Sequence, residues 1–126
     1  MNKKEFLSSD KEILELAAKA ASINLQWMLL GPVEIRDNII TEWNPLSSDS
    51  DALKLAVLLG ITITPYPIYA NPKHSVIAKK YNSKGYIRDK NTSEVIEVYN
   101  NDPMSATRRA IVRCAAKLSR GFIVEE

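Results

Sequence analysis

WNPLSSDSDALKLA (residues 43–56) and DPMSATRRAIVRCAA (residues 102–116) are the two stretches that decide the fold. Each places a polar turn directly before an apolar run with helical spacing. In the first stretch, residues 47–50 supply the N-cap of a helix predicted over residues 51–59. Gly60 then ends this helix, because glycine most easily adopts the left-handed backbone that closes a helix.

The second stretch begins the last helix of the chain. Asp102 can cap this helix, and Pro103 suits the first helical position because the N–H that proline lacks would have no partner there. We expect the helix to end near Arg120, with Gly121 in its C-terminal cap.

The helix predicted over residues 51–59 is apolar nearly all the way round, with Lys54 as the main exception. A helix of this kind is normally covered on more than one side. Either the rest of the fold or a partner subunit in a homo-oligomer is therefore expected to cover it.

The remaining elements follow from capping, alternation and turn signals. Residues 9–12 have the spacing of a capping box and predict a short amphipathic helix that ends near Ser22. Asp37-Asn38 tolerates a tight turn and predicts a hairpin. Pro65 and Pro67 cannot donate to a sheet ladder, so the strand before them lies at an edge or breaks there. The predicted strands cover residues 25–30 (stopped by Gly31-Pro32), 33–36, 39–43, 61–64, 76–81, 86–89 and 94–99.

This order of helix, strands, helix, strands and helix predicts an α+β fold. It consists of a mostly antiparallel sheet layered with three helices, in a single domain of residues 1–126.

Composition excludes several classes of protein. The net charge of +2, from 17 basic and 15 acidic residues, makes nucleic acid an unlikely general partner. No stretch has the length of a signal peptide core or a membrane span, so we expect no membrane partner and a cytoplasmic location. One cysteine and one histidine exclude an intrachain disulfide and make a structural zinc site improbable.

The last helix offers two faces. One face is predicted to be core and carries Met104, Thr107, Ile111, Cys114, Ala115 and Leu118. The opposite face carries Arg109, Arg113, Lys117 and Arg120, and it is either a solvated surface or a surface that faces anions.

Arg108 lies at the edge of the apolar stripe and therefore needs a partner. Within the fold the partner would be a carbonyl or a carboxylate such as Asp49 or Asp51. The alternative is a ligand carboxylate or phosphate, which suits the planar fork of arginine. In both cases we predict that Arg108 brings the two stretches together.

The aromatic residues are further candidates for core or ligand contacts. Trp43 is either a core residue, with Asn44 holding the turn, or a stacking platform, with Asn44 contacting the edge of a ligand ring. Trp27 is simply expected in the core. Tyr66, Tyr69 and His74 lie on or near the segment broken by prolines, where loops often carry function. The predicted ligand-binding residues are Trp43, Asn44, Asp49, Arg108, Arg109, Tyr66 and Tyr69.

No phosphate loop, dinucleotide fingerprint or nucleophile elbow is present in the sequence. A dyad of Cys114 and His74 is disfavoured because Cys114 falls on a buried helix face. Asp49 and Asp51 act as helix caps rather than as a facing pair of carboxylates. We therefore expect a protein that is not an enzyme, with no cofactor, no metal and no catalytic residue.

Trp43-Asn44-Pro45 and residues 106–110, ATRRA, resemble the phage ABA sandwich domain, a family of small bacteriophage proteins. The resemblance covers residues 43–56 and 102–118 well and the intervening strands only in general pattern. Cys114 departs from it, because a small alanine-like residue is usual there. The resemblance implies an α-β-α sandwich with the sheet in the middle, a phage origin and therefore the cytoplasm of a host bacterial cell, and it assigns no active site.

Three functions are consistent with these features. The first is a phage accessory protein that binds a small anionic or nucleotide-derived ligand and sequesters an immune signal of the host, which would make it an anti-defence protein. The second is a protein–protein interaction or regulatory module. The third is weak nucleic-acid binding through the basic row of the last helix.

Overall fold

The computed structural model describes residues 10–66, 74–80, 93–99 and 101–124, with side chains to residue 119. The described elements confirm the α+β class. They are α2 (Asp10–Ala20), β1 (Leu25–Met28), β2 (Gly31–Arg36), β3 (Ile39–Glu42), α3 (Asp49–Leu59), β4 (Thr62–Tyr66), β5 (Ser75–Lys80), β6 (Ser93–Val98) and α4 (Pro103–Val124). None of the described helices is both long and apolar enough to cross a membrane.

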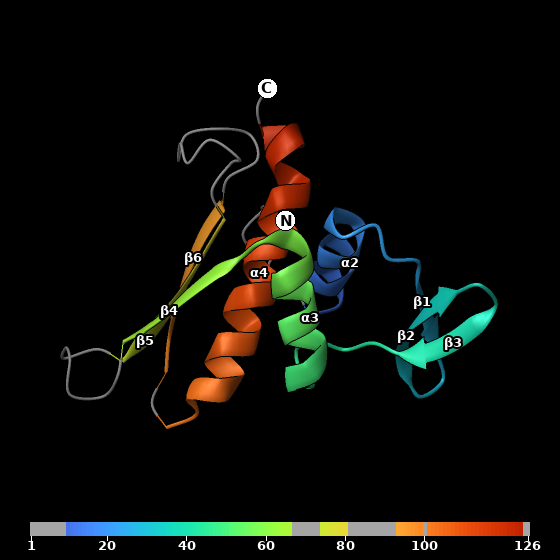
Figure 1. The fold of residues 1–126 in the computed structure, drawn as a ribbon, viewed down its shortest axis with the longest axis horizontal. Helices are drawn as coiled ribbons and strands as arrows, with labels where there is room; N and C mark the ends of the chain where they lie inside the picture. The colour runs from blue at the N-terminus through green and yellow to red at the C-terminus, as the bar shows by residue number, and fades with distance from the viewer. Residues whose placement is uncertain (1–9, 67–73, 81–92, 100, 125–126) are drawn as a thin grey trace.

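The helices lie between two sheets (Figure 1). α4 runs through the centre, and it packs against β4, β5 and β6 on one side and against α2 and α3 on the other. The sheet β1-β2-β3 projects beyond α2 and α3. This layer order differs from the central sheet that the resemblance implied, because the described strands form two antiparallel sheets of three strands each, instead of one.

α4 can occupy the centre because small side chains cover much of its surface. Ala110, Cys114 and Ala115 have no exposed area, and Val112 on another side of the helix is equally buried. Close approach is therefore possible from both a helical layer and a sheet. The buried part of α4 is therefore wider than the predicted core face. Met104 was wrongly assigned to that face, since its side chain is 51% exposed. The helix also continues through Gly121 to Val124, so the predicted cap at Gly121 is wrong.

α3 has the predicted caps and begins two residues earlier than predicted. The Ser48 hydroxyl accepts a hydrogen bond from the backbone N–H of Asp51 at 3.1 Å. Gly60 has φ 72°, and its N–H donates to carbonyls of the last turn. Ala52, Leu55 and Ala56 are buried, whereas the opposite side of the helix is not covered.

The sheet β4-β5-β6 places Pro65 in an edge strand, as predicted, where it pairs with Val76. β5 and β6 confirm the strands predicted at residues 76–81 and 94–99 with small shifts of their ends. The predicted strand at residues 86–89 lies outside the described residues.

The sheet β1-β2-β3, here called the arm, contains the predicted hairpin around Asp37-Asn38, whose φ angles are 52° and 67°. The strand predicted over residues 25–30 is wrong at its end. β1 stops at Met28, Leu29 and Leu30 form a turn, and Gly31 begins β2 instead of stopping β1. Gly31 has a φ of 131°, which glycine adopts without strain because it has no side chain, so the chain can turn here.

Candidate functional site

The two stretches that decide the fold meet through Arg108, as predicted. Its Nε donates to the carbonyl oxygen of Leu46 at 2.8 Å, and its Nη1 donates to Oδ1 of Asp49 at 2.6 Å. The Arg108 side chain is only 18% exposed. Arg108 therefore joins α4 to the turn before α3 with partners that belong to the fold, which is the intramolecular alternative.

Hydrogen bonds of Asn44 and Asp51 stabilise the turn before α3. The backbone N–H of Asn44 donates to Oδ2 of Asp51 at 2.9 Å, and Oδ1 of Asn44 accepts from the backbone N–H of Leu46 at 3.1 Å. The second contact, from the N–H of Leu46 to the Asn44 side chain two residues before it, is that of an Asx turn. The Asn44 side chain thus acts in the turn, as the structural interpretation of this residue predicted.

Trp43 is 5% exposed and belongs to the hydrophobic core. A stacking platform needs an open ring face, so this burial argues against that interpretation of Trp43. Among the described residues, every buried side-chain nitrogen or oxygen has a hydrogen-bond partner. The burial of Trp43 and the internal partners of Arg108 favour the structural alternatives that the sequence left open for both residues.

Replacing Arg108 with alanine is expected to lower the free energy of unfolding by about 1–3 kcal/mol. The Leu46 carbonyl would lose its charged hydrogen-bond donor, and the apolar contacts of the arginine methylene groups would be lost. Arg109→Ala is the matched control, since the Arg109 side chain is 36% exposed and forms a surface ion pair with Asp10, and such pairs contribute at most about 1 kcal/mol. Urea unfolding of both variants checks this. An equal loss in the two would contradict the structural role of Arg108.

In its described part the predicted basic row is partly exposed, and each of its cations has a partner within the fold. Arg109 pairs with Asp10 at 2.9 Å, Arg113 pairs with Glu97, and Lys117 donates to the Glu94 carbonyl at 3.0 Å. These partners exist because α4 lies between α2 and the sheet. The Arg120 side chain lies outside the described residues.

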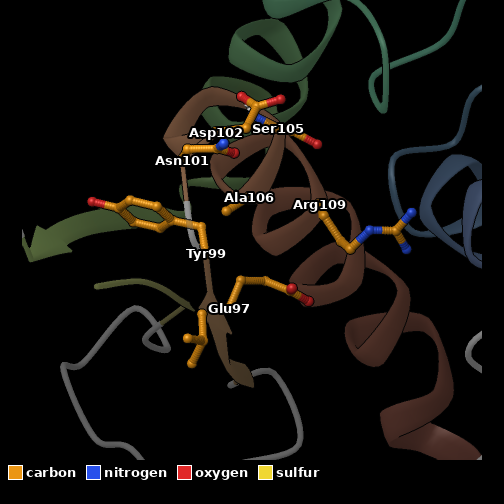
Figure 2. A pocket seen from close by; sticks show the side chains of 8 residues that line it. Glu97, Tyr99, Asn101, Asp102, Ser105, Ala106 and Arg109 are labelled. Carbon is orange, nitrogen blue, oxygen red and sulfur yellow. Dashed lines mark hydrogen bonds between the residues drawn. The ribbon is translucent and has the colours of Figure 1, made fainter. Parts of the chain in front are cut away.

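An open pocket of about 240 Å³ lies at the start of α4 (Figure 2). Its lining includes Asn101, Asp102, Ser105 and Tyr99. Arg109 also borders it, but its guanidinium turns away from Tyr99 and towards α2 (Figure 2). Oδ1 of Asp102 accepts from the backbone N–H of Ser105 at 3.0 Å and so serves as the predicted cap.

An aromatic cluster lies beside this pocket. The rings of His74 and Tyr99 are 5.6 Å apart, and the Tyr99 hydroxyl donates to the Tyr66 carbonyl at 3.3 Å. The structure therefore brings Tyr66 and His74 together through Tyr99, which the sequence analysis had not selected. Tyr69 lies outside the described residues.

Cys114 has no exposed area, and burial raises the pKa of its thiol. A reactive cysteine needs the opposite shift and needs access to solvent. Within the described part of the chain, no group of three or more histidine, cysteine, aspartate or glutamate side chains could hold a metal ion.

The most unusual surface of the described chain is apolar. Leu29 is 100% exposed and Leu30 is 95% exposed, at the turn between β1 and β2. We call these two residues the arm tip. A glycine is favoured at the last position of many tight turns, so Gly31 was the sequence signal that could have placed these leucines in a turn.

Two further apolar surfaces are exposed. The first is the outer side of α3, with Leu53, Val57 and Leu58 between 61% and 73% exposed. The second belongs to the arm itself, on which Trp27, Met28, Ile39 and Ile40 are all exposed. Trp27 was wrongly expected in the core. Its indole N–H donates to Oε2 of Glu15 at 3.0 Å, and Lys11 lies 5.4 Å from its ring centre.

Comparison of the chain with protein-family models, curated proteins and solved structures gives no match. The resemblance to the phage ABA sandwich domain therefore stays a prediction.

Proposed function

We propose that this protein is a protein–protein interaction module whose arm tip inserts into an apolar groove of a partner protein. The observation that carries the proposal is the complete exposure of Leu29 and Leu30 at a turn. Single exposed apolar residues are ordinary on protein surfaces. Two adjacent, almost fully exposed leucines at a hairpin turn are not, because turns normally carry glycine, proline and small polar residues.

The geometry of the arm supports this function. The arm projects from the helical layer (Figure 1), and Leu29 and Leu30 at its β1–β2 turn are almost fully exposed, so a partner protein can reach them. Trp27 ties β1 to α2 through Glu15, which limits movement of the arm. A tip that is held in place loses less conformational freedom on binding than a flexible loop does. The phage resemblance makes a bacterial host protein the first class of partner to test.

The double variant Leu29→Ser/Leu30→Ser is expected to weaken partner binding by about a hundredfold or more, because each buried leucine contributes roughly 1.5–3 kcal/mol. It should leave the unfolding transition almost unchanged, since neither side chain contacts the core. Tagged protein expressed in bacteria would yield a partner, identified by mass spectrometry, whose affinity is then measured with purified components.

Leu53→Ser/Leu58→Ser is the matched control, because it removes two equally apolar exposed leucines from α3. The proposal fails if both double variants bind the partner equally well. It also fails if wild-type protein floats with anionic lipid vesicles and the arm-tip variant does not, while the variant binds every protein partner as well as wild type does. That result would assign the tip to a membrane surface.

A phage accessory protein that sequesters a small anionic or nucleotide-derived ligand is the second candidate. The open pocket at the start of α4, with Tyr99 in its lining, is the observation that favours it. Calorimetry against cyclic nucleotides and ADP-ribose derivatives tests it, and the absence of heat across the panel would count against it.

A further inference from the structure

The arm has an exposed edge strand, β3, whose backbone is suited to strand pairing. β2 lies in the middle of the arm, so β1 and β3 are its edges. β1 is tied to α2 through Trp27 and Glu15. In β3 all four residues are exposed, from Ile39 to Glu42.

The turn at Asp37-Asn38 decides which backbone groups of β3 are free. Arg36 and Ile39 flank a two-residue turn and form a hydrogen-bonded pair. Because the direction of the backbone groups alternates along an antiparallel strand, Ile39 and Thr41 point into the arm. Trp43 continues this alternation, since its N–H donates to the Pro32 carbonyl at 3.1 Å. The N–H and C=O groups of Ile40 and Glu42 therefore point outward along the free edge.

The edge strand β4 is blocked in a way that β3 is not. β4 is an edge strand with Pro65 inside it, and proline has no N–H to offer to a further strand. β3 contains no proline, and Glu42 is its sole charged residue. Natural proteins rarely leave such an edge uncovered.

We propose that β3 of one molecule pairs antiparallel with β3 of a second copy about a two-fold axis, with Thr41 opposite Thr41 of the second copy. The two arms would then form a continuous six-stranded sheet. This inference rests on the proposed interaction function and deepens it, because the resulting dimer carries an arm tip at each end of the joined sheet. A partner with two grooves would bind such a dimer with a gain from avidity.

The register centred on Thr41 uses the β3 edge better than the registers centred on its two neighbours. With Thr41 at the centre, Ile40 and Glu42 of each copy form hydrogen-bonded pairs with Glu42 and Ile40 of the other, so every outward group of β3 is used. A centre at Ile40 places Glu42 opposite Asn38, which belongs to the turn. A centre at Glu42 places two carboxylates directly opposite each other, which is destabilising. The register centred on Thr41 also brings two threonines together, a favourable pair.

Thr41→Cys tests the register directly. Residues that face each other in a non-hydrogen-bonded pair have Cα atoms about 4.5 Å apart, which is within the range of a disulfide. The native Cys114 is buried and does not compete. We expect Thr41→Cys to form a covalent dimer rapidly under mild oxidation, and Ile40→Cys, the matched control, to form little. Crosslinking of Ile40→Cys alone, or of neither variant, would overturn the proposed register.

Ile40→Pro tests the pairing itself. It removes an outward N–H that the arm does not use, so the arm should keep its own ladder. We expect wild-type protein to sediment as a dimer and Ile40→Pro to raise the dimer dissociation constant roughly tenfold to a hundredfold, because each dimer loses two hydrogen bonds. Ile40→Ala keeps the N–H and should retain most of the dimer. Circular dichroism and urea unfolding check that all variants are folded.

The two proposals can fail separately. Wild-type protein that sediments as a monomer at all concentrations overturns the β3 pairing and leaves binding through the arm tip intact. A dimer that persists in Leu29→Ser/Leu30→Ser, without any partner that responds to this variant, overturns the proposed function and retains the pairing. A dimer that is weakened as strongly by Ile40→Ala as by Ile40→Pro would show that side chains, not strand edges, hold the copies together.

Discussion

Trp43→Ala is expected to lower the free energy of unfolding by about 3–5 kcal/mol, the largest single loss that we predict, because it removes a large buried ring and leaves a cavity. Trp43 is 5% exposed and lies in the core with residues of α2, α3 and α4. Natural domains have a total stability of only about 5–15 kcal/mol, so this variant should be barely folded. Urea unfolding followed by circular dichroism measures the loss.

Trp27→Ala is the matched control, since Trp27 is 38% exposed and holds a surface hydrogen bond with Glu15. It should cost about 1 kcal/mol. Trp43→Phe keeps most of the buried ring and provides a folded variant if the alanine variant does not fold. Equal losses for Trp27→Ala and Trp43→Ala, or quenching of Trp43 fluorescence by nucleotides in a Trp27→Phe background, would return Trp43 to the role of a ligand platform.

Leu55→Ala is expected to lower the free energy of unfolding by about 2–5 kcal/mol, because Leu55 is 1% exposed and lies on the side of α3 that faces the core. Leu53→Ala, two residues away on the same helix, removes the same atoms from a side chain that is 61% exposed. It should change stability by no more than about 0.5 kcal/mol. Thermal and urea unfolding of the pair checks the difference.

The comparison of these two variants decides what covers α3. If no other subunit covers α3, only Leu55→Ala of these two variants should lower the free energy of unfolding substantially. A large loss for Leu53→Ala that depends on protein concentration would instead show that another subunit covers the outer side of α3, as the all-round apolar pattern of this helix first suggested. That result would move the main interface from the arm to α3.

Local signals in the sequence determined several helix caps and one tight turn. Ser48 and Gly60 cap α3, Asp102 caps α4, and Asp37-Asn38 makes the tight turn, because each of these depends on contacts within a few residues. The link between Arg108 and Asp49 was also predictable, since a half-buried guanidinium needs a partner and capping carboxylates were close to the other stretch.

The sequence by itself therefore determined the α+β class, both caps of α3, the N-cap of α4, the edge position of β4 and the contact between the two stretches. The tertiary structure alone decided which tryptophan is buried, which side of α3 is covered and where Leu29 and Leu30 lie. The physical reason is that periodicity says that a face is apolar but not what lies against it. α4 lies between a helical layer and a sheet, so its basic residues found partners on both sides, whereas the arm projects and leaves its own apolar residues in solvent.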